Sequence, residues 1–289
     1  MANLGPGFDV LGVAVPFHIE VEAELAPSPE VSVEGEGVGV MMEDERNLSY
    51  MAAQHLFAEA GVGRRPLRLR VANRIPVARG LGFSGAARLA GILAANALIG
   101  EPLDRKKILD LAAELEGHPD NVVASMVGGF VVSCLTEEGV RFVRIEPPPG
   151  LKLVLAIPEV PLETQKARLA LPEEIPFSTA VFNLGRCALL VAALAKGDFD
   201  ALEAAIQDRL HQPYRERLVP FMRDVVEAAR RAGARGAALA GAGPTIVALT
   251  DRNEREVASS MSEALRAHGV PHRVEIVKPE REGARVERL

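Results

Sequence analysis

Apolar and polar residues alternate along the first quarter of the chain in a way that predicts strands around one helix. Residues 13–36 favour two antiparallel strands, with Pro27-Ser-Pro29 as the turn between them. Residues 47–60 instead show helical spacing, and Gly61 follows them as a C-terminal cap. Residues 67–72 alternate apolar and basic side chains, which is the pattern of a half-buried strand.

Similar patterns continue through the rest of the chain. We expect helices over 86–98, 103–115, 183–196, 201–210, 219–232 and 254–268, and strands over 130–135, 151–157 and 273–276. Residues 236–249 indicate two strands joined by a glycine loop. From Lys278 onward the mixed basic and acidic sequence predicts a frayed tail.

A proline-rich segment divides the chain into two parts of similar size. The 289 residues are enough for one large domain or for two of ordinary size. Pro147-Pro-Pro-Gly150 is the most linker-like segment. We therefore expect one domain over residues 1–149 and a second over 150–289.

A glycine-rich loop joins the strand at 67–72 to the helix at 86–98. Its sequence is Pro76-Val-Ala-Arg-Gly-Leu-Gly-Phe-Ser-Gly-Ala-Ala87. The start of a helix carries unpaired backbone N–H groups and about half a positive charge. Glycine lets an anion approach the backbone closely. The loop therefore predicts a phosphate site, with a tight turn that binds nothing as the alternative.

The loop fits neither of the two best-known phosphate-binding motifs well. A P-loop needs a lysine after its glycines, and none follows here. Residues 80–85 satisfy G-x-G-x-x-G, and Glu101 lies near the distance expected for the acidic residue of a dinucleotide site. No βαβ unit is predicted around the loop, so that match is weak.

A second cluster of polar residues follows the helix at 103–115. Glu114-Leu-Glu-Gly-His-Pro-Asp-Asn121 places three carboxylates, an imidazole and a carboxamide within eight residues. A turn at Gly117 and Pro119 lets the last three polar side chains converge on one spot. A charged helix end that only faces solvent is the alternative.

Composition narrows the class of protein. A net charge of −6 argues against non-specific binding to nucleic acid or to anionic membranes. Cys134 and Cys187 lie in apolar runs and form no C-x-x-C pattern, so we expect buried free thiols in a reducing compartment. No signal peptide and no apolar run near 18 residues is evident, which favours a cytoplasmic location. No His/Cys cluster suits zinc.

Six segments together resemble the GHMP kinases, and among these the homoserine kinase branch. The glycine-rich loop is similar to the family motif P-x-x-x-G-L-G-S-S-A-A, with Phe83 at the usual first serine and Gly85 at a usual alanine. The others, in family order, are A-N-L-G-P-G-F-D at 2–9, E-G-H-P-D-N at 116–121, T-x-x-A-R at 164–168, H-Q-P-Y-R at 211–215 and G-A-G-P-T at 241–245.

Two features depart from the family pattern. Ala240 replaces the serine that usually precedes G-A-G-P-T. Homologues carry a short strand before the opening motif, whereas this sequence starts at Met1. Either the sheet lacks that edge strand or the start site has been placed too late.

The resemblance implies an α+β GHMP kinase fold. In that fold an N-terminal domain like domain 2 of ribosomal protein S5 precedes a ferredoxin-like C-terminal domain, and the active site lies between them. The implied reaction transfers a phosphoryl group from ATP to the hydroxyl of L-homoserine, giving O-phospho-L-homoserine for threonine biosynthesis. The resemblance also suggests a homodimer, with no nucleic-acid or membrane partner.

The nucleotide and its metal ion are assigned residues through the same resemblance. The expected ATP-binding residues are Asn47, Pro76, Arg79, Gly80, Leu81, Gly82, Phe83, Ser84, Gly85 and Ala86. Asn47 is also a plausible helix N-cap. Mg²⁺ prefers one or two carboxylates together with phosphate oxygens and water, so we expect Ser84 and Glu116 to hold it. Glu114 stays a competitor, because its spacing from the loop does not separate the two.

L-homoserine is a zwitterion, so its site needs a cation for the carboxylate and an anion for the ammonium. Arg168 and Arg215 would supply the first and Asp9 the second. The other substrate contacts expected from the resemblance are Asn3, His118, Asn121, Thr164 and Gly241. The catalytic residues are expected to be His118, Asp120 and Asn121, with the histidine and the asparagine orienting the hydroxyl.

Two other functions stay open. One is a GHMP kinase that acts on another alcohol, such as mevalonate or a sugar, although the charge pattern fits an amino acid better. The other is an inactive GHMP-fold protein that senses metabolites, which Phe83 and Ala240 motivate. The retained Ser84, Glu116 and Asn121 count against the second.

Overall fold

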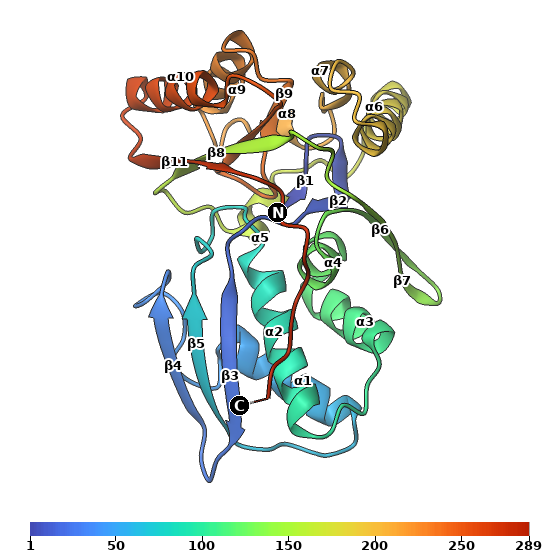
Figure 1. The fold of residues 1–289 in the computed structure, drawn as a ribbon, viewed down its shortest axis with the longest axis vertical. Coiled ribbons are helices and arrows are strands. Elements are labelled where there is room, and N and C mark those ends of the chain that lie inside the picture. Colours follow the sequence, from blue (N-terminus) through green and yellow to red (C-terminus); the bar gives the residue numbers. More distant parts are fainter. Residues whose placement is uncertain (289) are drawn as a thin grey trace.

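The computed structural model describes residues 1–288 as two lobes that share a central layer (Figure 1). The strands are β1 (Ala2–Asn3), β2 (Gly7–Val13), β3 (Ile19–Leu25), β4 (Glu30–Gly35), β5 (Leu67–Asn73), β6 (Phe130–Thr136), β7 (Gly139–Ile145), β8 (Lys152–Pro158), β9 (Gly236–Leu239), β10 (Ile246–Thr250) and β11 (His272–Val277). The helices are α1 (Leu48–Glu59), α2 (Phe83–Leu98), α3 (Arg105–Glu116), α4 (Asp120–Val127), α5 (Thr164–Leu169), α6 (Phe177–Lys196), α7 (Leu202–Ala205), α8 (Gln212–Arg215), α9 (Met222–Arg231) and α10 (Glu254–Ala267).

Three small sheets organise these elements. The lower lobe holds the sheet β3-β5-β4, against which α2 packs, with α1 packed against α2; the middle layer holds β1-β2-β6-β7. The upper lobe holds the antiparallel sheet β11-β8-β10-β9, covered by α9 and α10. The predicted α+β class is confirmed.

The predicted hairpin over residues 13–36 is wrong in its pairing. Strands β3 and β4 form where expected, but β5 lies between them, antiparallel to β3 and parallel to β4. The alternation in β5 suits this central place, because its leucines face the core while Arg68 pairs with Glu24 and Glu30 on either side. Opposite charges on neighbouring strands stabilise this order.

Helix α2 crosses the centre of the lower lobe and begins at Phe83, three residues before its predicted start. Leu89, Ile92 and Ala95 on one side of it are fully buried. Gly82 caps the N-terminus in a left-handed conformation, with φ at 80°. The helix is thereby anchored in a core and presents its first turn to the middle layer.

A single apolar core joins the two lobes. It contains Leu11 and Val13 of β2, Leu155 of β8 and Val247 of β10. The C-terminal segment also crosses back over the lower lobe (Figure 1). Its backbone pairs with Ala14, Gly129 and Ser125 through residues 280–284, so the prediction of a frayed tail is wrong.

Helix α6 is longer than predicted. It starts at Phe177 instead of residue 183. The sequence pattern did not show the first turns, because the polar Ser178, Thr179 and Asn183 interrupt an otherwise apolar run. Among residues 1–288 it is the one helix long and apolar enough to cross a membrane. The expectation that no such run exists was therefore wrong, although its inner side packs into the shared core.

The two cysteines are free thiols but are not both buried. Cys134 is exposed near the outer end of β6, where the β6–β7 hairpin extends beyond the core. Cys187 is half-buried in α6, and burial raises the pKa of its thiol. The predicted burial of Cys134 is wrong.

Candidate active site

The glycine-rich loop lies between the lobes and is held by residues from both. A Cβ on Gly80 would come 2.1 Å from the carbonyl oxygen of Ala240, and one on Gly82 would come 2.6 Å from Oδ1 of Asn121. Both glycines have positive φ, at 76° and 80°. Only glycine fits this path, which keeps the backbone against both neighbouring motifs.

The first turn of α2 is open to an anion. No side chain caps this end of the helix within residues 1–288, so its N–H groups stay available to phosphate oxygens. The ring of Phe83 packs against the core shared by the lobes, so it need not displace a bound phosphate. Leu81 and Ala86 are buried in the same core.

Other residues expected to bind ATP have mainly structural contacts. Arg79 donates to the carbonyl oxygens of Pro158, at 2.7 Å, and of Glu159. It therefore fastens the loop to the end of β8. Asn47 is the N-cap of α1, accepts from the N–H of Ser49 and is 2% exposed. The predicted cap is confirmed, and its contact with adenine stays a prediction.

Ser84 and Glu116 come together although they are 32 residues apart. The Ser84 hydroxyl donates to Oε1 of Glu116, and Arg88 donates to Oε2. The Glu116 side chain is only 5% exposed. Glu114 is exposed on α3 instead, so the structure separates the two candidates and places Glu116 beside the loop.

This hydroxyl–carboxylate pair fits a magnesium ion. Hard oxygen donors of this kind, completed by phosphate oxygens, are what Mg²⁺ prefers. Arg88 was not identified from the sequence as a residue of the site. It lies one helical turn after Ser84, so i,i+4 spacing on the predicted helix was the signal that pointed to it.

The turn after α3 brings three further polar residues together. Nδ1 of His118 lies 2.6 Å from Oδ1 of Asp120, which also accepts the backbone N–H of Asn121 at 2.6 Å. Asp120 has no exposed surface, and its Oδ2 has no partner within the described chain. Oδ1 of Asn121 is likewise buried without a partner and faces Gly82.

Electrostatics favour a charged imidazole here. Burial alone would lower the pKa of His118, but its hydrogen bond to Asp120 and the charges of Asp120, Glu116 and Asp9 raise that pKa above 6.5. Nε2 of His118 is left 3.8 Å from Glu116, and no hydrogen bond to it is found within residues 1–288. The ring can therefore donate toward a ligand.

The opening loop carries Asp9 to this cluster. One ligand-type atom each from Asp9, His118 and Asp120 lies within 4.8 Å of the others. The backbone N–H of Asp9 donates to Oδ1 of Asn3 at 3.1 Å, and Nδ2 of Asn3 donates to Gly241 at 2.8 Å. Asn3 is 4% exposed, so it is firmly held.

Asp9 and Arg168 form an ion pair with each other. The guanidinium of Arg168 donates to both carboxylate oxygens, at 2.7 and 2.9 Å. Both side chains stay about one third exposed, at 31% and 38%. The predicted anion and cation of the substrate site thus lie side by side and satisfy one another.

Arg215 is buried, at 1% exposure, and has no carboxylate bonded to it within residues 1–288. It donates to the carbonyl oxygens of Ala167 and Gly241, and Nη1 lies 3.2 Å from Nδ1 of His211. Burial, and then the charge of Arg168, lower the pKa of Arg215 to about 10. It is still a cation at neutral pH and suits an incoming carboxylate.

His211 supports Arg215 as a neutral ring. Its Nε2 lies 2.8 Å from the carbonyl oxygen of Gly5, so Nε2 carries the proton and Nδ1 accepts from Arg215. Burial lowers the pKa of His211, which agrees with this assignment. Buried Asp208 accepts three backbone N–H groups at the start of α8 and fixes the turn.

Phe8 is a second residue that the sequence did not single out for the site. The guanidinium carbons of Arg168 and Arg215 each lie 5.3 Å from its ring centroid, and the His211 ring lies 5.4 Å away. Phe8 therefore holds the two arginines in place by cation–π contact. Thr164, by contrast, lies exposed at the start of α5, and no hydrogen bond to its side chain is found in the described chain.

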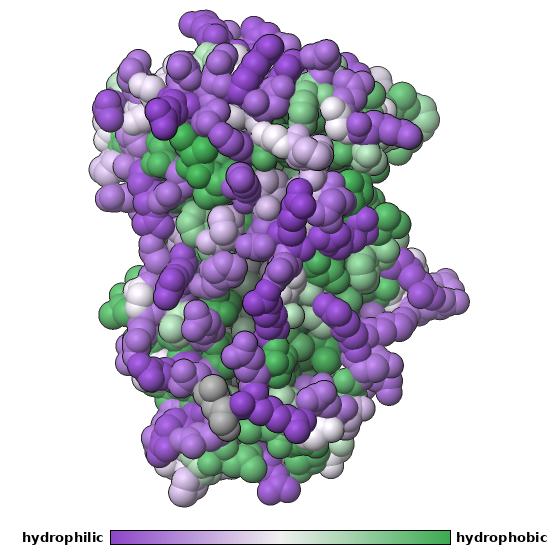
Figure 2. Space-filling view, in the orientation of Figure 1, coloured by the Kyte–Doolittle hydropathy of each residue, from purple (hydrophilic) through white to green (hydrophobic). Residues whose placement is uncertain are grey.

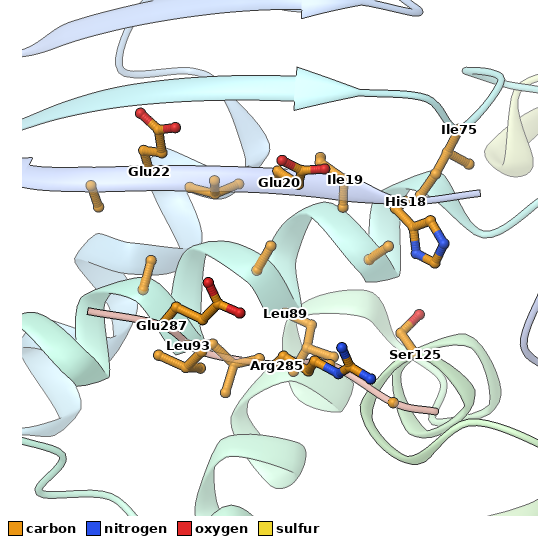
Figure 3. Close-up of a pocket in the computed structure, with 18 of the residues that line it drawn as sticks. His18, Ile19, Glu20, Glu22, Ile75, Leu89, Leu93, Ser125, Arg285 and Glu287 are labelled. Carbon is orange, nitrogen blue, oxygen red and sulfur yellow. The ribbon is translucent and has the colours of Figure 1, made fainter. Parts of the chain in front are cut away.

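A cavity lies beside this site. Its volume is about 1530 Å³, and it runs between the free edge of β3, one face of α2 and the tail at 280–288. Figure 3 shows Glu20 and Glu22 of β3 on one side, with Arg285 and Glu287 of the tail across from them. It reaches the phosphate loop at Leu81, Gly82 and Ala86 and contains none of the predicted catalytic residues.

Comparison with known proteins identifies the family to which the chain belongs. Residues 47–129 match the GHMP kinases N terminal domain, and residues 190–270 match the GHMP kinases C terminal domain. The chain belongs to the GHMP kinase family. It is accordingly an ATP-dependent kinase and a soluble metabolic enzyme.

Homoserine kinases are prominent among its relatives. The homoserine kinase of Carboxydothermus hydrogenoformans is 44% identical over 284 residues, covering 98% of this chain and 93% of that protein. The homoserine kinase of Moorella thermoacetica is 44% identical over 98% of this chain and 96% of its own length. The crystal structure of homoserine kinase from Cytophaga hutchinsonii superposes with a TM-score of 0.88 at 30% identity, covering 98% and 93% of the two chains. The predicted GHMP fold is confirmed.

Proposed function

We propose that the chain is a homoserine kinase, which transfers the terminal phosphoryl group of ATP to the side-chain hydroxyl of L-homoserine. The products are ADP and O-phospho-L-homoserine, an intermediate on the route to threonine. The observation that carries the proposal is the placement of Asp9, Arg168 and Arg215 beside the turn that holds His118 and Asn121. These charges suit a zwitterion with a free hydroxyl.

The substrate is proposed to enter between Asp9 and Arg168. Its ammonium group would replace the guanidinium at Asp9, while its carboxylate would take the donors of Arg168 and the free side of Arg215. The pair is partly exposed, and such pairs contribute only about 0.2–1 kcal/mol. The cost of opening it is therefore small beside the two new ionic contacts.

The hydroxyl is proposed to be oriented by Asn121 and His118, close to the glycine-rich loop. Phosphoryl transfer depends on positioning and on charge neutralisation more than on covalent chemistry. The first turn of α2 and the loop glycines would bind the phosphates. The raised pKa of His118 suits a proton donor toward phosphoryl oxygens rather than a general base.

Asp120 is proposed to position the other two residues. It is fully buried, and its Oδ1 is already engaged by His118 and by the N–H of Asn121. Its Oδ2 has no partner within residues 1–288 but is buried as well, so a substrate proton has no direct path to either oxygen. The hydroxyl proton therefore leaves after phosphoryl transfer, without a dedicated base.

Ser84 and Glu116 would hold the magnesium ion that accompanies ATP. When bound, such an ion neutralises charge on the phosphates and fixes their orientation. Arg88 occupies the second oxygen of Glu116 and would keep that carboxylate turned toward Ser84. We also propose a cytoplasmic homodimer, with a domain boundary between residues 149 and 150.

A substrate panel tests this function. ADP release would be measured with Mg·ATP and L-homoserine, with mevalonate, galactose and L-serine as controls. Turnover confined to L-homoserine is the expected result. Turnover with another alcohol would overturn the substrate assignment, and ATP binding without turnover on any of them would favour a metabolite sensor.

A further inference from the structure

One side of α6 is apolar, and nothing within residues 1–288 covers it. Phe177, Val181 and Leu184 are 84%, 52% and 72% exposed. The exposed Ala188, Ala192 and Ala195 continue the same line at helical spacing. Figure 2 shows apolar atoms gathered at the upper right margin of the molecule, where Figure 1 places α6. We call this line of residues the α6 stripe.

Charged groups are absent from the α6 stripe. Between Phe177 and Ala195 the helix has one charged residue, Arg186, half a turn of the helix away from the stripe. Its guanidinium lies 4.5 Å from the ring centroid of Phe182, which also carries Arg209 at 3.9 Å. The side of a surface helix that faces solvent normally carries polar residues. Depletion of charged residues is instead typical of the centre of a protein interface.

The two halves of the stripe complement each other in size. The first half carries the large side chains Phe177, Val181 and Leu184, and the second half carries Ala188, Ala192 and Ala195. An antiparallel copy of the helix would place Leu184 against Ala188 and Phe177 against Ala195. A parallel copy would instead bring large residues against large ones and leave gaps between the alanines.

We infer that the α6 stripe is the docking surface for a second copy of this chain, with the two α6 helices antiparallel about a two-fold axis. Such an interface is isologous, because the same patch is used twice. The inference rests on the proposed homodimer and adds its contact surface. It does not depend on the substrate assignment.

A membrane surface is a poorer occupant for this stripe. Helices that lie on a membrane carry lysine and arginine along their polar face, which attract anionic lipids. Here Arg186 is stacked on Phe182, Lys196 stands alone at the C-terminal end, and the chain has a net charge of −6. The arrangement of large side chains in one half of the stripe and alanines in the other would also give no packing advantage against lipid.

Analytical ultracentrifugation of the full chain tests the inference. The unaltered protein should sediment as a dimer, whereas Leu184→Glu and Ala188→Lys should each sediment as monomers with unchanged circular dichroism. Leu135→Glu is the matched control, because Leu135 is 56% exposed on β6, away from α6. That variant should stay dimeric.

Mixing the two α6 variants tests the antiparallel geometry. Glu at 184 of one chain would then face Lys at 188 of the other, so the mixture should recover dimers that neither variant forms alone. A parallel pair would not bring these residues together, and a mixture that stays monomeric would overturn the antiparallel arrangement.

The remaining outcomes test the α6 interface separately from the existence of a homodimer. A monomeric unaltered protein would overturn both, and a dimeric Leu184→Glu would overturn the α6 interface alone. Co-sedimentation of the unaltered protein with phosphatidylserine vesicles, lost in Leu184→Glu, would overturn it in favour of a membrane surface.

Discussion

Replacing Arg168 by alanine isolates one charged contact of the proposed substrate site. Arg215 is a poor choice for this purpose, because it is buried and its removal would disturb the packing around Phe8. Arg168 is 38% exposed, and within residues 1–288 it hydrogen-bonds only to Asp9, although it also contacts the ring of Phe8. Its loss should therefore leave the fold intact while removing one partner of the substrate carboxylate.

The magnitude follows from the geometry. Hydrogen bonds to charged groups contribute roughly 1.5–3 kcal/mol, and solvent screening at this exposure favours the lower end of that range. We therefore expect kcat/KM for L-homoserine to fall about tenfold in Arg168→Ala, since 1.36 kcal/mol corresponds to tenfold. Most of the change should appear in KM, because the carboxylate lies away from the reacting hydroxyl.

The assay compares two substrates. ADP release would be measured with L-homoserine and with 3-aminopropan-1-ol, which keeps the amine and the hydroxyl but lacks the carboxylate. Arg168→Ala should impair only the first, and Arg231→Ala, at an exposed arginine paired with Glu227, should impair neither. An equal loss with both substrates, or no loss with L-homoserine, would refute the assignment of Arg168.

Three further predictions concern the residues around the phosphate loop. Asp120→Asn removes the hydrogen bond and the charge that contribute most to raising the pKa of His118, so that pKa should fall in an NMR titration. In the unaltered protein the pair stabilises the fold fully below pH 6.5, and this contribution is lost as the pH rises through the raised value. A pKa that the substitution leaves unchanged would contradict the account. Gly82→Ala should lower the thermal midpoint and the affinity for ATP, through a backbone cost of about 1–2 kcal/mol and a clash with Asn121. Gly63 has positive φ but open space around it, so Gly63→Ala should show the backbone cost alone. Equal losses of stability in the two variants would contradict the clash. Arg88→Ala should raise the Mg²⁺ concentration needed for half-maximal ADP release several-fold, because Arg88 holds the Glu116 carboxylate turned toward Ser84. Glu114→Gln should leave this concentration unchanged. An unchanged or lower requirement in Arg88→Ala would contradict the positioning role of Arg88.

The sequence was most informative where chemistry is local. The glycine spacing around Gly80 and Gly82 requires positive φ and close backbone approach, and the structure shows both. The turn after α3 likewise brings His118 to Asp120, because residues two apart around Pro119 are within reach whatever the rest of the fold does. Such features depend on a few neighbouring residues.

Long-range pairing was harder to predict. Alternation located β3 and β4 but could not show that β5 lies between them, because strand order depends on which charges and apolar faces meet in three dimensions. The return of the tail to Gly129 rests on backbone hydrogen bonds, which any sequence can make. Composition therefore gave no sign of it.

The contacts among the proposed substrate-binding residues could not be predicted from the sequence either. Asp9 and Arg168 are 159 residues apart, and their assignment came from family resemblance, but nothing in the sequence showed that they would bond to each other. The sequence did not indicate that Phe8 contacts both arginines, which only the structure shows. Contacts of this kind arise from the meeting of the two lobes.

Identification of the reaction product tests the central claim most directly. After incubation with Mg·ATP and L-homoserine, ³¹P NMR should show one new phosphomonoester, coupled to a methylene group, in an amount equal to the ADP formed. That result would establish transfer to the side-chain hydroxyl. Release of inorganic phosphate alone, or formation of an acyl phosphate at the carboxylate, would contradict the proposed orientation of homoserine between Arg168 and Asn121.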